Sequence, residues 1–212
     1  GTLKIARTIR EYERAGPAAL HLEDFVTKKH GLPISVQKMC TNIRVLLDER
    51  RDPDFLTIAR TDAMAPWRDG LAEDPRGCEE EAFERLLAYC EAGVDAVFPN
   101  NATNDWIRRY GPRIPKPLVH LGGAPRKWPG KSDFTAREEE MTATELANYN
   151  VRLVIYATNM LSRGHRFMKE QYASWLAAGR FDFSPQDEID RADANEMIGL
   201  PEKEQMLAKY GE

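Results

Sequence analysis

Hydrophobic and polar positions repeat in blocks along this chain. Each block contains a segment of helical period, a Gly or Pro break, a short apolar run and a polar loop. The short apolar runs predict five strands, which are Ala18–Leu22, Phe55–Ala59, Val94–Phe98, Pro117–Leu121 and Val151–Tyr156. Because these strands alternate with helices and no hairpin signal separates them, the pattern predicts an α/β fold with a parallel sheet.

The segments between the strands have the spacing and end signals of helices. Thr2–Ala15 places apolar residues on one face and charges on the other, and Ser35 predicts an N-cap for a helix to about Arg50. A long polar loop is predicted from Pro66 to Gly77. The remaining predicted helices are Glu79–Ala92, Thr103–Tyr110, Thr142–Asn148 and Met160–Ala178.

Two architectures fit this order of elements: a doubly wound parallel sheet and part of a (β/α)8 barrel. A dinucleotide-binding sheet lacks its main marker, because the chain has no Gly-x-Gly-x-x-Gly turn. A complete barrel typically needs about 250 residues, and this chain has 212. A barrel would therefore lack three βα units at its front. We expect a barrel part at residues 1–180 and a helical tail at residues 181–212.

Composition narrows the class of protein. A hydrophobic content of 42% supports a core, and a net charge of −4 gives no reason to expect nucleic-acid or membrane binding. No apolar run approaches the ~20 residues that span a bilayer, and the N-terminus does not resemble a signal peptide. The three cysteines fit no metal-ligand spacing, so we expect reduced thiols and a cytoplasmic location.

Polar side chains collect at the predicted carboxyl ends of the strands, where α/β folds place their chemistry. They are His21, Glu23, Asp24, Arg60, Asp62, Asn100, Asn101 and His120. Because strand side chains alternate, His21 and Glu23 are expected on one face and Asp24 on the other. Burying an unpaired carboxylate is costly, so Glu23 is expected to have a metal ion, a partner or water.

These residues carry a resemblance that runs from about residue 3 to about residue 180. The segments are Leu20-His21-Leu22-Glu23-Asp24, Lys28-Lys29-His30-Gly31, Ile58-Ala59-Arg60-Thr61-Asp62-Ala63 and Ala92-Gly93-Val94-Asp95-Ala96-Val97-Phe98-Pro99. Together they resemble the isocitrate lyase and phosphoenolpyruvate (PEP) mutase superfamily, most closely its methylisocitrate lyase branch. The resemblance implies a (β/α)8 TIM barrel of which this chain forms about the last five βα units.

The resemblance also implies a cofactor and roles for site residues. It implies Mg2+, or Mn2+, and a 2-oxo or 2-hydroxy carboxylate as substrate. Glu23 would hold the metal, usually through water, Arg60 would grip a substrate carboxylate, and His21 would line the pocket. Mg2+ takes oxygen ligands and keeps several waters, and an Arg fork matches a carboxylate with two hydrogen bonds.

Three departures from the family pattern bear on the reaction. In the family, the other carboxylates that bind the metal come from an Asp-rich segment before the first helix. Gly1 of this chain corresponds to a position just after that segment. Lyases of the family carry a Cys where this chain has His30, which can perform acid–base work near neutral pH. Asn100 stands where the family often has Glu, and His120-Leu121 roughly where it has an Asn on the next strand.

Each carboxylate or Arg assignment has a simpler alternative. Glu23 could be a structural acid paired with Lys28 or Lys29 at the barrel rim. Arg60 with Asp62 could be a plain ion pair that caps a strand.

The histidines and asparagines also have simpler alternatives. His21 could be a core histidine that donates to a backbone carbonyl, His30 a surface residue, and His120 a pocket wall residue without proton transfer. Asn100-Asn101 could form only a turn before the next helix.

The leading hypothesis is a Mg2+-dependent carbon–carbon lyase of this superfamily that acts through an enolate. Its candidate catalytic residues are His30, Lys29 and Glu23, with Glu23 also at the metal. Its candidate substrate-binding residues are Arg60, His21, Asn100 and His120. Two alternatives keep the fold: an oxaloacetate-type decarboxylase or hydrolase, and a phosphonopyruvate/PEP mutase-like enzyme. A third is a non-catalytic barrel homologue that acts as an assembly partner.

The expected partners are a small carboxylate substrate and further copies of the chain, with no nucleic acid and no membrane. In the family the last barrel helix swaps between two subunits, which gives dimers that pair into tetramers. The apolar content of Met160–Ala178 is compatible with a homo-oligomer of that kind, and the alternative is an ordinary barrel helix.

Overall fold

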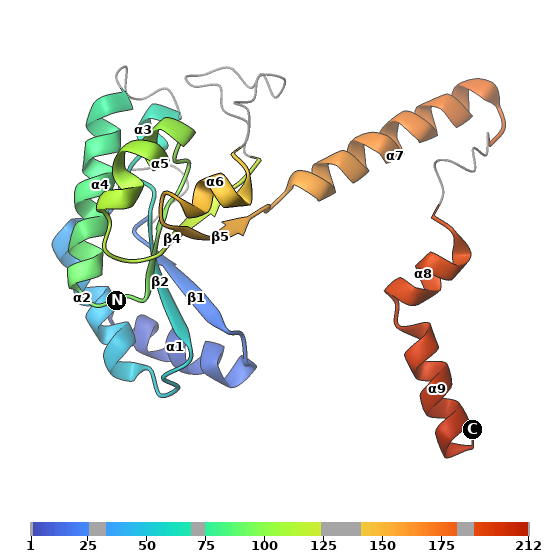
Figure 1. Ribbon diagram of the computed structural model, residues 1–212, viewed down its shortest axis with the longest axis horizontal. Coiled ribbons are helices and arrows are strands. Elements are labelled where there is room, and N and C mark those ends of the chain that lie inside the picture. Colours follow the sequence, from blue (N-terminus) through green and yellow to red (C-terminus); the bar gives the residue numbers. More distant parts are fainter. Residues whose placement is uncertain (1, 26–32, 69–74, 124–140, 182–188, 212) are drawn as a thin grey trace. The chain divides into compact units, whose positions relative to one another are not determined.

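The fold is built on one parallel sheet. The computed structural model describes residues 2–25, 33–68, 75–123, 141–181 and 189–211. Within them, five strands lie side by side in chain order, each parallel to its neighbours (Figure 1). The strands are β1 (Ala19–Glu23), β2 (Leu56–Thr61), β3 (Ala96–Pro99), β4 (Leu118–Leu121) and β5 (Val151–Ile155). All five predicted strands are confirmed, with ends that differ by at most two residues.

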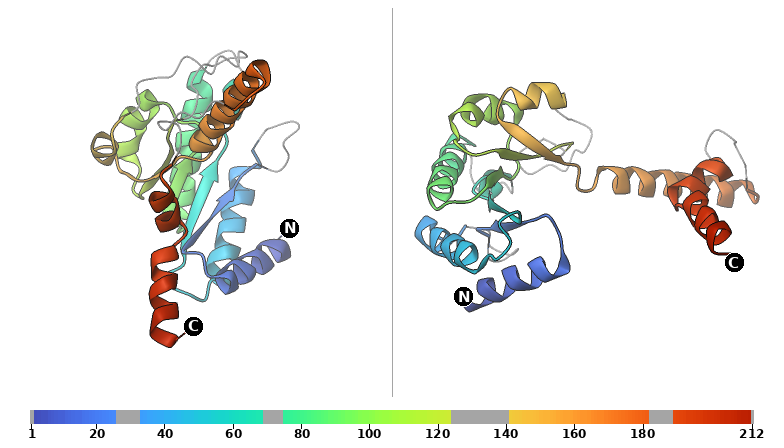
Figure 2. Two further views of the ribbon diagram at one scale, coloured as in Figure 1. Left: turned by 90° about the vertical axis from the view of Figure 1, so that its right-hand side faces the viewer. Right: turned by 60° about the horizontal axis from the view of Figure 1, so that its bottom comes forward.

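Helices precede and connect these strands and lie on one side of the curved sheet (Figure 2). They are α1 (Thr2–Ala15), α2 (Val36–Glu49), α3 (Ala65–Arg68), α4 (Pro75–Glu91), α5 (Asn104–Tyr110), the 3-10 helix η1 (Gly111–Arg113) and α6 (Ala143–Ala147). Neighbouring helices pack on each other, α1 on α2 and α2 on α4. A doubly wound sheet carries helices on both faces. Consecutive strands with helices on one side are instead the arrangement of a β/α barrel.

Side chains at the helix starts explain why several helices begin where they do. The Ser35 hydroxyl accepts a hydrogen bond of 3.2 Å from the Lys38 backbone N–H, as predicted. Thr142 and Glu145 form a reciprocal capping box at the start of α6. These local bonds satisfy backbone donors that the first helical turn leaves unpaired.

The long loop predicted for Pro66–Gly77 is wrong at both ends. Helix α3 already occupies Ala65–Arg68, and α4 begins at Pro75 rather than at Glu79. Pro and Gly in this stretch indicated a break. However, proline is tolerated in the first turn of a helix, where its missing N–H would have no partner in any case.

The two faces of the sheet are packed differently. The helix-covered face carries Ala59 and Val97, which join residues of α2, α4 and α5 in the largest apolar cluster. The opposite face carries a smaller cluster of Ile58, Phe98 and Val119 and is called the inner face below. In a β/α barrel the side away from the helices is the barrel interior, so polar groups on the inner face belong to its mouth.

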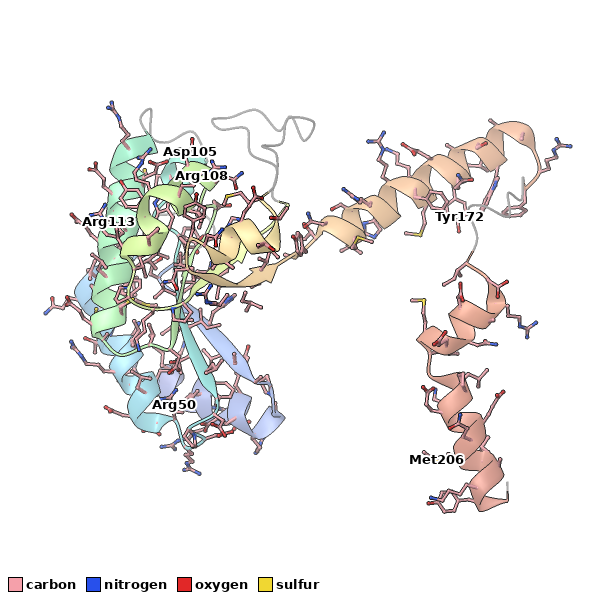
Figure 3. All side chains as sticks on the ribbon, viewed as in Figure 1. Arg50, Asp105, Arg108, Arg113, Tyr172 and Met206 are labelled. Atoms are coloured by element: carbon pink, nitrogen blue, oxygen red, sulfur yellow. The ribbon has the colours of Figure 1, made fainter. Side chains whose placement is uncertain are left out.

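The chain divides into two compact units, residues 1–160 and 161–212. The second unit is helical, with most of α7 (Asn159–Ala178), α8 (Arg191–Met197) and α9 (Leu200–Tyr210). The helix predicted over Met160–Ala178 is confirmed, and none of its residues is buried; Tyr172 on it is 59% exposed (Figure 3). The division expected at residue 180 stays a prediction. No helix of the described residues has the length and hydropathy to cross a bilayer.

Candidate functional site

Glu23 and Arg60 are neighbours across the first two strands. The pairing of β1 with β2 sets Glu23 opposite Arg60 and His21 opposite Ile58. Because Ile58 packs in the inner-face cluster, strand alternation places His21, Glu23 and Arg60 on the inner face. The Arg60 Nη2 lies 3.4 Å from Glu23 Oε2, and the two side chains are 22% and 43% exposed. An ion pair open to solvent therefore marks the carboxyl ends of these strands.

Asp62 binds the guanidinium of Arg60 through two hydrogen bonds. Arg60 Nε donates to Asp62 Oδ2 at 2.9 Å, and Nη2 donates to Oδ1 at 3.1 Å. The Asn100 side-chain amide donates to the same Oδ1. Asp62 is 3% exposed and Asn100 is 5% exposed. We call Glu23, Arg60, Asp62 and Asn100 the Arg60 cluster. Its two carboxylates and one guanidinium sum to a single negative charge.

Two rings border this cluster. The Arg60 Cζ lies 5.4 Å from the centroid of the Phe98 ring, a cation–π distance. The His21 and Phe98 rings lie 5.8 Å apart. Desolvation and the positive charge of Arg60 lower the pKa of His21 from its ordinary value, although Glu23 and Asp62 act in the opposite direction. His21 is therefore a neutral imidazole near pH 7, which can both donate and accept a hydrogen bond.

Asp24 lies on the other side of the same strand end and is fully buried. Its carboxylate accepts hydrogen bonds from the Thr61 hydroxyl at 2.7 Å, the Tyr89 hydroxyl at 2.7 Å and the Asp62 backbone N–H at 2.9 Å. Arg85 Nη1 lies 3.5 Å away. Desolvation raises the pKa of Asp24, and these donors and the Arg85 charge oppose the rise. The predicted opposite orientation of Asp24 and Glu23 is confirmed.

Arg85 and Tyr89 of α4 are functional candidates that the sequence analysis missed. Arg85 also donates to the Ile34 carbonyl at 2.7 Å and pairs with Glu81 at 2.7 Å. Ile34 in turn donates its N–H to the Asp24 carbonyl at 2.8 Å. The one sequence signal was an Arg directly before the apolar run Leu86-Leu87-Ala88, and α4 buries Arg85 to 7% exposure. A buried charge needs a partner, but the sequence did not indicate which residue would pair with Arg85.

The Arg60–Asp62 ion pair and a partner for Glu23 are observed. The partner is Arg60, and Glu23 itself is more exposed than the strand pattern suggested. The alternative pairing of Glu23 with Lys28 or Lys29 lies outside the described residues. So does His30 with its loop. The roles of Lys29 and His30 accordingly stay predictions.

His120 does not lie with the Arg60 cluster on the inner face. Its strand neighbours Val119 and Leu121 pack on the inner face, so alternation places His120 on the helix-covered face, beside Val154 of β5. His120 is 1% exposed. A substrate-binding role for His120 stays a prediction. Leu121 is the residue of this strand end that faces the cluster's side of the sheet.

A divalent metal would find one suitable carboxylate here. Glu23 offers exposed hard oxygen donors, which match Mg2+, an ion commonly held by one or two carboxylates plus waters. Among the described residues, no group of three or more His, Cys, Asp or Glu side chains could hold a metal ion. The donor chemistry of Glu23 thus fits Mg2+ as one of its ligands.

Comparison with known proteins places this geometry in a family. The sequence profile of the phosphoenolpyruvate phosphomutase family matches residues 2–176. The 2-methylisocitrate lyase of Shewanella oneidensis is 36% identical over 126 residues, which cover 56% of this chain and 40% of the relative. The isocitrate lyase of Haloferax volcanii is 36% identical over 195 residues, which cover 86% of this chain and 53% of the relative.

A solved structure extends the likeness to the fold. The structure of an oxaloacetate acetylhydrolase in complex with oxalate superposes with a TM-score of 0.75 at 23% identity, over all of this chain and 68% of that one. The chain spans about half, or less, of the length of the curated relatives above. The predicted fold, part of a TIM barrel of the isocitrate lyase and PEP mutase type, is confirmed. The chain belongs to the phosphoenolpyruvate phosphomutase family, within the isocitrate lyase/PEP mutase superfamily.

Proposed function

We propose that this protein cleaves a carbon–carbon bond of a small 2-hydroxy or 2-oxo di- or tricarboxylate with the help of a divalent metal. The observation that carries the proposal is the Arg60 cluster, which sets a guanidinium between two carboxylates at the carboxyl ends of β1 and β2. The relatives that align with this chain are named 2-methylisocitrate lyase and isocitrate lyase, which supports the reaction class.

Arg60 is the group that would bind a substrate carboxylate. Among the described residues, its hydrogen bonds to Asp62 use Nε and Nη2. Within that part of the chain, Nη1 remains for a substrate oxygen. The contact of Nη2 with Glu23 is long, at 3.4 Å, and charge-assisted hydrogen bonds are normally 2.7–2.9 Å. A substrate carboxylate could replace Glu23 at Nη2 while the Asp62 bonds keep the fork in place.

Glu23 would serve a different ligand. A cluster with one net negative charge attracts a cation more readily than a dianionic acid, so Glu23 would hold Mg2+ or Mn2+. When bound, such an ion polarises the oxygen of a 2-oxo acid and stabilises charge that develops there. His21, neutral near pH 7 because of its lowered pKa, would line the same face and hydrogen-bond to substrate without adding charge.

Asn100 would support substrate binding through its contact with Asp62. Its side-chain amide donates to Asp62 and is almost fully buried, so it holds the carboxylate toward Arg60. The proton donor would be His30, assisted by Lys29, since His works as an acid or base near neutral pH. A second reaction, hydrolysis or decarboxylation of an oxaloacetate-like acid, is favoured by His30 at the position where lyases of the family have Cys.

A proton NMR time course on the purified protein, with and without Mg2+, tests the proposal. The acids are 2-methylisocitrate, isocitrate, 2,3-dimethylmalate, oxaloacetate and phosphonopyruvate. We expect Mg2+-dependent release of a 2-oxo acid from one of the first three. Products from oxaloacetate alone would establish the second reaction instead. No turnover of any of the five acids would overturn both.

Two matched variants connect turnover with the site. Arg60→Gln should remove activity, whereas Arg113→Gln should not. The Arg113 guanidinium, labelled in Figure 3, packs at 4.3 Å over the ring of Phe83, which belongs to the apolar cluster on the helix-covered face. A His30→Ala variant with full activity would remove His30 from the mechanism. Equal losses in Arg60→Gln and Arg113→Gln would show that neither reports on the site.

We also propose a cytoplasmic homo-oligomer, a dimer or tetramer joined through α7. The apolar side chains of this helix are exposed in the single chain, including Leu161, Phe167 and Leu176 at 60%, 43% and 84%. Light scattering after gel filtration measures the mass, and a mass near the 24.2 kDa of one chain would count against this proposal.

A further inference from the structure

Asp24 lies outside the Arg60 cluster, and its carboxylate binds several hydrogen-bond donors. It is fully buried, and three hydrogen-bond donors converge on its two oxygens. One of them is the backbone N–H of Asp62, the residue whose carboxylate binds Arg60. Another is the hydroxyl of Thr61, the residue before it. The Asp24 carboxylate therefore fixes the chain at Thr61 and Asp62, and Asp62 is the residue that binds Arg60.

The backbone is fixed on both sides of Asp62. The Thr61 hydroxyl, which donates to Asp24, also accepts the Ala63 backbone N–H at 3.2 Å. The Asp62 carbonyl accepts the Ala65 backbone N–H at 2.8 Å. A bidentate Arg–carboxylate pair requires both oxygens to align with the guanidinium plane. Fixing the backbone of Asp62 in this way leaves its side chain few alternatives to the observed geometry.

Asp24 is itself held from α4. The Tyr89 hydroxyl donates to Asp24 Oδ2 at 2.7 Å. Burial and the Asp24 charge raise the pKa of Tyr89, so this hydroxyl keeps the proton that it donates. Arg85 supplies the compensating positive charge at 3.5 Å. Helix α4 and the ends of β1 and β2 are thus joined by one buried polar network whose donors and acceptors are matched, which makes it rigid.

We propose that Asp24, held by Tyr89 and Arg85, is a positioning residue that sets the Arg60–Asp62 pair in the orientation that receives a substrate carboxylate. The inference rests on the proposed function, in which Arg60 binds that carboxylate. Asp24 touches neither substrate nor metal in this scheme and acts through Thr61 and Asp62. The competing explanation is that the network only stabilises the fold.

Tyr89→Phe tests the proposal with the smallest change, because it removes one hydroxyl and keeps the buried ring. The matched control is Tyr110→Phe, a second buried tyrosine of the same apolar cluster, 6% exposed, on α5. With Mg2+ and the acid that the time course identifies, we expect Tyr89→Phe to raise KM about fivefold with kcat changed less than about twofold. Tyr110→Phe should leave KM unchanged.

This split separates positioning from stability. A variant that merely folds less well has fewer active molecules, so its apparent kcat falls while its KM stays constant. Asp24→Asn keeps the shape of the side chain and should raise KM more than Tyr89→Phe does. A KM equal to that of the wild type in both variants would overturn the inference.

A second measurement does not depend on turnover. The Arg60 Nε–H donates to Asp62 at 2.9 Å, and its signal can be followed in a 15N–1H correlation spectrum. We expect it to shift or broaden in Tyr89→Phe and Asp24→Asn and to stay in place in Tyr110→Phe. An unmoved signal in the first two variants would refute the positioning role. If no acid is turned over, the proposed function fails, and this spectrum still decides the inference by itself.

Discussion

Two Arg–Asp pairs lie at opposite ends of the same strands, and they differ in what else they bind. At the amino ends, Arg50 Nη1 donates to Asp95 Oδ2 at 2.7 Å; Figure 3 labels Arg50. At the carboxyl ends, Arg60 binds Asp62 at 2.9 Å. Both Arg side chains are 22% exposed. The exposure of the arginines therefore does not distinguish the pairs, although the Asp95 side chain is 31% exposed and the Asp62 side chain 4%.

The other hydrogen-bond partners of the two pairs do distinguish them. Asp95 also accepts the backbone N–H and the hydroxyl of Thr57, both at 2.8 Å, and Arg50 also donates to the Phe55 carbonyl at 3.1 Å. This pair is tied to the backbone and joins the starts of β2 and β3. Within the described part of the chain, the Asp62 carboxylate binds the side chains of Arg60 and Asn100 and no backbone group.

Side chains can exchange partners without unfolding a strand, whereas a backbone bond cannot be given up so easily. The comparison thus separates a pair that stabilises from a pair that can bind. It agrees with the division in β/α barrels, where the amino-terminal face supports stability and the carboxyl-terminal face carries chemistry.

The largest expected effect comes from replacing the arginine of each pair, which tests whether the Arg60–Asp62 pair binds substrate and the Arg50–Asp95 pair does not. Arg60→Gln should lower kcat/KM by about 100-fold or more, because it removes a bidentate charge-assisted group. Arg50→Gln should change kcat/KM less than about twofold and lower the unfolding free energy instead. Steady-state kinetics and urea unfolding of both variants measure this. Arg60→Lys should recover little, since a lysine lacks the planar fork. Similar kinetics in Arg50→Gln and Arg60→Gln would remove the distinction.

Asp95→Asn should lower the unfolding free energy by about 2 kcal/mol at pH 7. Burial raises the pKa of Asp95, but hydrogen bonds from Thr57 and the charge of Arg50 outweigh it, so the net pKa is lowered. A lowered folded-state pKa gives stability that is present above the unfolded value of about 3.9 and is lost as pH falls through the folded value. Urea unfolding should therefore show a smaller difference between wild type and variant at pH 3, and an equal difference at both pH values would contradict this assignment.

Glu23→Gln should raise the Mg2+ concentration for half-maximal activity about tenfold, because an amide is a weaker ligand than a carboxylate for a hard cation. The matched control is Glu13→Gln. Glu13 accepts the backbone N–H groups of Arg51 and Asp52 at 2.8 and 3.0 Å, near the amino ends of the strands. A Mg2+ titration of activity compares them. A shift of the same size in Glu13→Gln would show that the effect is not local to Glu23.

The smallest expected effect concerns the ring beneath Arg60. Phe98→Leu should raise KM about threefold, since it removes a cation–π contact at a partly exposed site. Phe55→Leu is its control at the amino end, because both phenylalanines are 2% exposed. Both variants should lose stability through the smaller side chain, and only Phe98→Leu should change KM. Thermal melting and steady-state kinetics together distinguish the two, and an unchanged KM in Phe98→Leu would mean that the ring does not tune Arg60.

Much of the fold could be predicted because its signals are local. Apolar runs, Gly and Pro breaks and the Ser35 cap lie within a few residues of the elements they define. The alternation along β1 was enough to separate Glu23 from Asp24. The error at Pro66–Gly77 had the same local origin, because Pro75 is a breaker inside a helix and a good residue at its start.

The candidate site could be predicted only in part, because its contacts join distant segments. That Arg60 and Asp62 would pair was readable from their spacing. That Glu23 lies opposite Arg60 depended on the register of β1 and β2. Nothing local indicated that Tyr89 would bind Asp24, 65 residues away in the chain.

By itself, the sequence determined the order of the five strands and of the longer helices between them, and the identity of the polar groups that end the first four strands, because hydrophobic periodicity and strand alternation depend only on neighbouring residues. The tertiary structure decided which of these groups meet. It turned His120 to the helix-covered face and placed Asn100 on Asp62. It also enclosed Asp24 between α4 and the ends of two strands, since a buried carboxylate is stable only where several separate segments bring donors to it.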